Sequence, residues 1–289
     1  MLAFPGEPPR RGSHRCPVGD GTAVLRWAEW GPPDGSPVVC VHGLTRTGRD
    51  FDALAAALAA RGRRVVCPDV FGRGLSDWLP DRSLYAVPTY ARALAPLLRG
   101  IGRAYDWVGT SMGGLVAMAL LAAGEGAGMR RLVLNDVGAH IPSAALRRIA
   151  AYLSAPPPEF ADLGPLERHL RAIHAPFGDL GDAGWRHLAA TSARTDAAGR
   201  VLLHYDPALA RAFASAPTDD VDLWAAWGTI TVPTLVLRGE SSDLLLPGTA
   251  ARMAERPGAR VVVVPGCGHA PALMDEAQVA TVVGFLDGG

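Results

Sequence analysis

The sequence predicts an α/β protein built on a mostly parallel β-sheet. Short valine-rich runs alternate along the chain with longer segments rich in alanine and leucine, which is the pattern of strands joined by crossover helices. From residue 37 onward the runs are continuously apolar, as expected for strands covered on both faces. With 289 residues, the chain is long enough for one large domain or for a core domain that carries an insertion.

The elements follow from these runs in chain order. We expect strands at 22–29, 37–41, 64–67, 105–109, 131–135, 233–238 and 260–264. Helical spacing and length predict helices at 51–61, 88–99 and 114–123. Residues 138–224 interrupt the alternation, because they are rich in Ala, Arg, His, Pro and aromatic residues and contain no convincing buried strand. We therefore divide the chain into core segments 1–137 and 225–289 and a helical insertion, 138–224.

Composition excludes several classes of function. The formal net charge is zero, which gives no electrostatic reason to expect a nucleic acid or an anionic membrane as partner. All 28 basic residues are arginine, so a lysine Schiff base and a phosphate-loop lysine are both impossible. The four cysteines are scattered without a C-x-x-C pair, and neither a metal nor another cofactor is expected. The N-terminus lacks a signal-like apolar run, so we expect a soluble, cytoplasmic protein acting on a small molecule.

The stretch "WVGTSMGGLV" at 107–116 contains the pattern G-x-S-x-G between a predicted strand and a predicted helix. An abrupt turn from strand to helix strains the central residue and brings its neighbours against other backbone. Glycine at 109 and 113 removes that collision. Ser111 would then project from the carboxyl end of the sheet at a helix N-terminus, where partial positive charge favours an oxyanion.

Two backbone amides are candidates for binding that oxyanion. His42-Gly43-Leu44 follows the strand at 37–41, and its turn can bring the Leu44 N–H toward Ser111. The second donor is the N–H of Met112, the residue after the serine. His42 is also considered as a base, although a histidine that opens such a turn more often braces the loop.

A base and an acid are expected from two late loops. His269 follows the strand at 260–264 on a glycine-rich turn, whereas the histidines of the insertion are expected to be solvated or to pack within it. We assign Asp243, just past the strand at 233–238, as the carboxylate that orients His269. Asp136 is the alternative, because it too follows a strand.

Taken together, these segments resemble the α/β-hydrolase superfamily. The chain shows H-G after an early strand, "PDVFGRGLSD" at 68–77, G-x-S-x-G, a G-x-x-x-D loop and a late G-x-G-H, in that order. Phe71 and Arg73 stand where arginine and histidine are common in the family, a change that leaves the turn intact. The resemblance implies the α/β-hydrolase fold: an eight-stranded, mostly parallel sheet with helices on both faces and a helical cap after the sixth strand.

The expected chemistry is acyl transfer by Ser111, with the apolar side chains of the cap choosing the substrate. A serine at the turn argues against relatives that need an aspartate nucleophile, the haloalkane dehalogenases and epoxide hydrolases. Ester hydrolysis is preferred, carbon–carbon cleavage of meta-cleavage products is the alternative, and a non-catalytic binding role is a third possibility. Phe177, Trp185 and Phe213 are the candidate substrate-binding residues for an apolar or aromatic substrate, although each could instead hold the cap to the core.

Overall fold

Eight strands form one sheet in the computed structural model, which describes residues 4, 7–102, 104–212 and 219–288. Their order across the sheet is β1-β2-β4-β3-β5-β6-β11-β12. Strand β2 runs antiparallel to both of its neighbours, β1 and β4, and all neighbouring pairs from β4 to β12 are parallel. The strands are β1 Arg10–Val18, β2 Gly21–Trp30, β3 Ser36–Val41, β4 Arg63–Asp69, β5 Tyr105–Thr110, β6 Met129–Asn135, β11 Thr234–Gly239 and β12 Ala259–Val264. This confirms the predicted mostly parallel sheet and seven of its strands.

The strand that sequence reasoning did not predict is β1, at the edge of the sheet. It pairs only with β2, and of its nine residues only Cys16 is buried. An edge strand with polar side chains has no continuous apolar run, which is why its sequence carries little signal.

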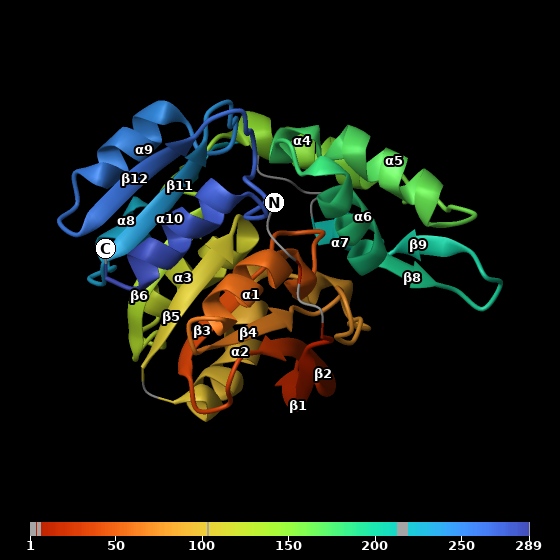
Figure 1. Ribbon diagram of the computed structural model, residues 1–289, viewed down its shortest axis with the longest axis horizontal. Helices are drawn as coiled ribbons and strands as arrows, with labels where there is room; N and C mark the ends of the chain where they lie inside the picture. Colours follow the sequence, from red (N-terminus) through yellow and green to blue (C-terminus); the bar gives the residue numbers. More distant parts are fainter. Residues whose placement is uncertain (1–3, 5–6, 103, 213–218, 289) are drawn as a thin grey trace.

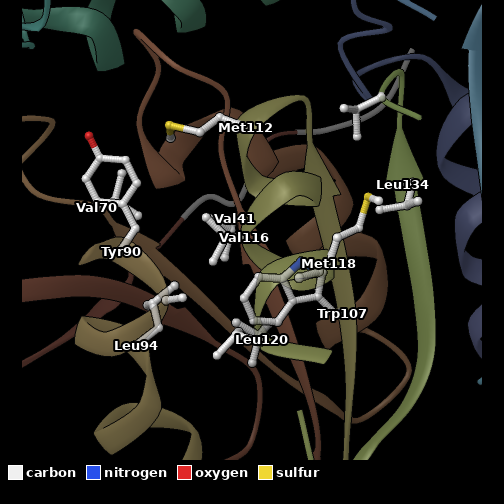
Figure 2. Packing of buried hydrophobic residues seen from close by; sticks show 14 of the residues in the cluster. Val41, Val70, Tyr90, Leu94, Trp107, Met112, Val116, Met118, Leu120 and Leu134 are labelled. Atoms are coloured by element: carbon white, nitrogen blue, oxygen red, sulfur yellow. The ribbon is translucent and has the colours of Figure 1, made fainter. Parts of the chain in front are cut away.

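Helices cover both faces of the sheet (Figure 1). On one face lie α1 Asp52–Ala59 and α10 Glu276–Leu286, and on the other lie α2 Val87–Ile101, α3 Met112–Ala122, α8 Trp224–Gly228 and α9 Pro247–Ala254. Alternate residues of β3 supply the two cores: Val39 and Val41 pack toward α3, whereas Val38 and Cys40 pack toward α1. Figure 2 shows side chains of α2 and α3 meeting those of β3, β5 and β6 in the core on the α3 side of the sheet.

The chain between β6 and β11 is mainly helical. It contains α4 Ser143–Ser154, α5 Leu163–Ile173, α6 Gly181–Ser192 and α7 Leu209–Ala212, which Figure 1 shows grouped at one side of the molecule. It also contains two short antiparallel ribbons, β7 His140–Ile141 with β10 Val221–Asp222 and β8 Ala193–Thr195 with β9 Val201–Leu203. Strands of two or three residues are too short to show periodicity, so the sequence pattern missed them. Three short 3₁₀ helices complete the elements: Gly48–Phe51, Arg82–Leu84 and Ala175–Phe177.

Buried contacts hold this segment against the core. His187 of α6 lies 3.1 Å from the buried carboxylate of Asp52, and Tyr85 donates a hydrogen bond of 2.7 Å to Asp206. Within the described residues, no helix combines the length and hydropathy needed to cross a bilayer.

Candidate active site

Three polar side chains meet at the carboxyl end of the sheet, each just after a different strand. Ser111 follows β5, Asp136 follows β6, and His269 lies in the loop after β12. The His269 Nε2 atom is 2.9 Å from Ser111 Oγ, and its Nδ1 atom is 2.7 Å from Asp136 Oδ2. Because an ionised carboxylate only accepts hydrogen bonds, Nδ1 is the donor and the Nε2 lone pair faces the serine hydroxyl. This arrangement allows a proton to pass from Ser111 to His269.

The local backbone explains why Ser111 projects into the site. Its φ of 50° and ψ of −112° are unusual for a residue with a side chain, a strain of about 1–3 kcal/mol that the surrounding structure must offset. A Cβ on Gly109 would lie 2.5 Å from the Gly113 backbone, and a Cβ on Gly113 would overlap the Val41 carbonyl oxygen. The two glycines therefore permit the sharp turn, as the sequence predicted.

Asp136 is fully buried and its carboxylate accepts three hydrogen bonds. Oδ1 accepts from the Gly239 N–H at 2.8 Å, and Oδ2 accepts from the Ser242 hydroxyl at 2.6 Å as well as from His269. The donors fix both oxygens, so the carboxylate has one orientation in which it can hold the imidazole.

The prediction that Asp243 orients His269 is wrong. The Asp243 side chain is 50% exposed and forms an ion pair with Arg148 of α4, at 2.5 and 2.9 Å. Asp136 and Asp243 follow adjacent parallel strands, β6 and β11, so strand ends alone could not separate them. In the fold, the loop that carries Asp243 instead turns Ser242 inward to support Asp136.

The predicted oxyanion donors flank the serine. The Gly43 turn passes so close that a Cβ there would lie 3.9 Å from Ser111 Cβ. Within the described residues, no hydrogen bond occupies the Leu44 N–H. The N–H of Met112 is at the first position of α3, where no intrahelical partner exists. Arg73, which is fully buried, donates to the Leu44 carbonyl at 2.7 Å and contacts Met112 Sδ, so it braces both donor segments.

His42 braces the loop and does not reach the serine as a base. Its Nδ1 donates to the Gly43 carbonyl at 2.7 Å, while Nε2 accepts from the Val70 N–H at 3.0 Å. Burial lowers the pKa of His42 to about 3, so the ring is neutral at pH 7. Both ring nitrogens are thus engaged, as the bracing interpretation predicts.

Two cavities meet at Ser111. We call the first the apolar cavity; it measures about 270 Å³, and its walls include Leu44, Tyr90, Leu115, Ile141, Leu146 and Leu244. We call the second the arginine cavity; it measures about 170 Å³, and its walls include Arg46, Arg148, Tyr152, His174, Phe177 and His269. Ser111, Leu44 and Ile149 belong to both, so the reacting group would lie where the cavities join.

Of the two candidate substrate-binding residues that the structure describes, Phe177 lines a cavity beside Ser111 and Trp185 does not. Trp185 is buried against the Arg171 guanidinium and belongs to neither cavity, so its packing role is the one observed. Phe213 lies outside the described residues. His174, expected to be solvated or packed within the insertion, lines the arginine cavity, where burial and the Arg46 charge hold its pKa well below the usual value.

Sequence reasoning also gave no site role to Arg46, Arg73, Arg148 or Ser242. The signals are weak, because an arginine on a helix or in a turn is usually solvated and nothing local marks a buried one. No group of three or more His, Cys, Asp or Glu side chains suited to a metal ion occurs in the described part of the chain.

Comparison with known proteins gives consistent matches over nearly the whole chain. Residues 38–282 match the family described as "Alpha/beta hydrolase family". A 3-hydroxybutyrate-oligomer hydrolase of Cupriavidus necator is 41% identical over 97% of this chain and 98% of that protein. A 2-(acetamidomethylene)succinate hydrolase of Mesorhizobium japonicum is 28% identical over 95% of each.

Solved structures agree in fold. A putative hydrolase from Rickettsia typhi superposes with a TM-score of 0.90 at 27% identity, covering 97% of this chain and 99% of that chain. An α/β hydrolase from Novosphingobium aromaticivorans superposes with a TM-score of 0.84 at 35% identity, covering 96% and 98%.

Proposed function

Because the chain belongs to the α/β-hydrolase family, we propose that it hydrolyses carboxylic esters through a covalent acyl intermediate on Ser111. The observation that carries the proposal is the unbroken chain of hydrogen bonds from Ser111 through His269 to Asp136. A serine hydroxyl is a weak nucleophile until a base accepts its proton, and His269 Nε2 is positioned to do so.

In the proposed mechanism, Ser111 Oγ attacks the ester carbonyl while its proton moves to His269 Nε2. The Leu44 and Met112 N–H groups donate to the resulting oxyanion; one such donor typically contributes about 3 kcal/mol to lowering the barrier. His269 then protonates the leaving alkoxide, and water repeats the cycle on the acyl-enzyme. Asp136 keeps the imidazole in the required tautomer throughout. The groups named here suffice, so no cofactor is required.

For the substrate, we propose a short oligoester of a hydroxycarboxylic acid. The relative from Cupriavidus necator is named a 3-hydroxybutyrate-oligomer hydrolase, and its match covers 97% of this chain. The apolar cavity, about 270 Å³ and without a charged wall residue, supports a small or medium acyl group. We further propose that residues 138–224 act as a cap, because α4 supplies Leu146, Arg148 and Ile149 to the cavity walls.

Labelling with a fluorophosphonate followed by intact mass measurement tests the nucleophile. We expect one adduct on the wild-type protein and none on Ser111→Ala. An adduct that persists in Ser111→Ala would contradict the assignment, and no adduct on the wild type would indicate a binding protein.

A substrate panel tests the reaction. We expect turnover of p-nitrophenyl esters of graded acyl length, with a decline once the acyl group outgrows the apolar cavity. A dienoate substrate for carbon–carbon cleavage serves as the comparison, since the same three groups could act on it. Turnover of the dienoate alone would refute ester hydrolysis.

A further inference from the structure

The two cavities beside Ser111 differ in charge. No charged side chain lines the apolar cavity, whereas the walls of the arginine cavity carry Arg46 and Arg148 and no carboxylate. Arg46 comes from the core turn after β3, and Arg148 comes from α4 of the insertion, so each part of the chain contributes one guanidinium.

Each guanidinium is held by an aspartate that lies outside the cavity wall. Arg46 donates through Nε and Nη2 to Asp50, at 2.8 and 2.7 Å, and Arg148 uses the same two nitrogens toward Asp243. Within the described residues, Nη1 of either arginine makes no hydrogen bond. A guanidinium has five N–H donors, so each aspartate fixes one edge and leaves N–H groups for an anion in the cavity.

The position of His269 tells which half of an ester would enter the arginine cavity. His269 lines this cavity and not the apolar one. In ester hydrolysis, the protonated imidazole delivers its proton to the oxygen of the leaving alcohol. The leaving alcohol therefore lies on the side of the arginine cavity, and the acyl group extends into the apolar cavity.

We propose that the arginine cavity binds a carboxylate carried by the alcohol half of the substrate, so that the enzyme releases a hydroxycarboxylic acid. This inference rests on the proposed ester hydrolysis, and it adds which half of the ester lies in each cavity. The bond from Ser111 Oγ to the carbonyl carbon forms, the bond from that carbon to the alcohol oxygen breaks, and the proton on His269 moves to that oxygen. On an oligoester, cleavage proceeds from the carboxyl end, because only the last unit presents a free carboxylate.

The two arginines have different parts in this subsite. Arg46 has a side chain only 6% exposed and pairs with Asp50 within one turn of chain, so its donors are fixed in place. Arg148 is 52% exposed, and its surface ion pair with Asp243 contributes little to stability. Arg148 can therefore change its side-chain conformation when the substrate binds, whereas Arg46 provides a fixed position for the carboxylate of the substrate.

A matched substrate pair tests the charge preference. The probes are 3-(butyryloxy)butyrate and its neutral twin 3-(butyryloxy)butanamide, with butyrate release as the readout. We expect wild-type kcat/KM to favour the carboxylate, and Arg46→Gln or Arg148→Gln to reduce that preference about tenfold each, as loss of a charge-assisted hydrogen bond predicts. Arg168→Gln, an exposed arginine of the insertion that lines neither cavity, is the control and should keep the preference.

The ratio of kcat/KM for the carboxylate to kcat/KM for the amide distinguishes loss of carboxylate binding from misfolding, since a variant that folds poorly loses activity on both substrates alike. Equal activity of the wild type on the twins, or an unchanged ratio in Arg148→Gln, would overturn the subsite while leaving ester hydrolysis intact. Absence of butyrate release from both twins, together with absence of a fluorophosphonate adduct, would instead refute the proposed function.

A second measurement needs no variant. A linear trimer of 3-hydroxybutyrate with an isotope label in its carboxyl-terminal unit is incubated with the wild-type protein, and the early products are identified by mass spectrometry. We expect labelled monomer first, because Arg46 and Arg148 line the cavity that contains Ser111 and only the carboxyl-terminal unit carries a free carboxylate. Unlabelled monomer appearing first would show that the bond cleaved is not the one next to the unit with the free carboxylate, and it would refute cleavage from the carboxyl end.

Discussion

Replacing Asp136 with asparagine should abolish most activity while keeping the fold, and the hydrogen bonds show why. The Gly239 N–H donates to Oδ1, so the asparagine carbonyl oxygen will take that position. The amide NH₂ must then occupy the place of Oδ2 and donate to His269 Nδ1. This forces the proton of the neutral imidazole onto Nε2, which can no longer accept the proton of Ser111.

The magnitude follows from loss of the correct tautomer. The same exchange in serine proteases lowers kcat by about 10⁴, which corresponds to about 5 kcal/mol in the barrier. Asp243→Asn is the matched comparison, because the two aspartates follow neighbouring strands. It breaks an ion pair with half-exposed partners, worth at most about 1 kcal/mol, so we expect less than about a fivefold loss on a neutral ester.

The assay is steady-state hydrolysis of p-nitrophenyl butyrate at pH 7.5, about one unit above the usual pKa of histidine. Thermal unfolding of each variant controls for damage to the fold. If Asp243→Asn loses about 10⁴ in kcat while Asp136→Asn retains activity, the argument from His269 geometry fails.

Two further predictions concern the turn at Ser111 and the brace at His42. Gly113→Ala should lower the free energy of unfolding by about 3 kcal/mol or more, since its Cβ would overlap the Val41 carbonyl. Gly100→Ala in α2, where a Cβ meets nothing within 4 Å, should raise it by about 0.5–1 kcal/mol in the same urea titration; equal effects would contradict the steric argument. Because burial lowers the pKa of His42 from 6.5 to about 3, the unfolded chain binds this proton between those pH values and the folded chain does not. The free energy of unfolding should therefore decrease as the pH is lowered from 6.5 to about 3, and His42→Asn should flatten this slope by about 1.4 kcal/mol per pH unit near pH 5. The same slope in both proteins would refute it.

Local chemistry explains how much of the fold the sequence could predict. Continuous apolar runs such as 37–41 and 233–238 identify strands buried on both faces, and the structure has them as β3 and β11. Strand β1 was not predicted because an edge strand buries few apolar side chains. The ribbon of β8 and β9 was not predicted because its strands have only three residues each. Periodicity reports burial, so it is silent where an element is stabilised mainly by backbone pairing.

The active-site residues also fall into those that the sequence could predict and those that it could not. Ser111 and its glycines could be predicted, because a strained turn restricts which residues fit there. The Asp136 assignment could not be fixed, because parallel strands deliver several loops to one edge and only the folded positions of Gly239 and Ser242 show which carboxylate is held. The sequence did not mark Arg46 and Arg148 as site residues, since the role proposed for them depends on the cavity that they line in the fold.

Neighbouring residues of the loop after β11 face in opposite directions, and this couples the two proposals. Ser242 turns inward and donates to Asp136, which fixes the carboxylate that orients His269. Asp243 turns outward and holds Arg148, which lines the cavity on the His269 side of Ser111. Because Asp243 is not needed to orient the imidazole, it is available to position a cation from the insertion. A single short loop can therefore set both the tautomer of the base and the charge of the leaving-group cavity. For this reason, Asp243→Asn should act mainly on the choice between charged and neutral substrates, and Asp136→Asn on turnover of both.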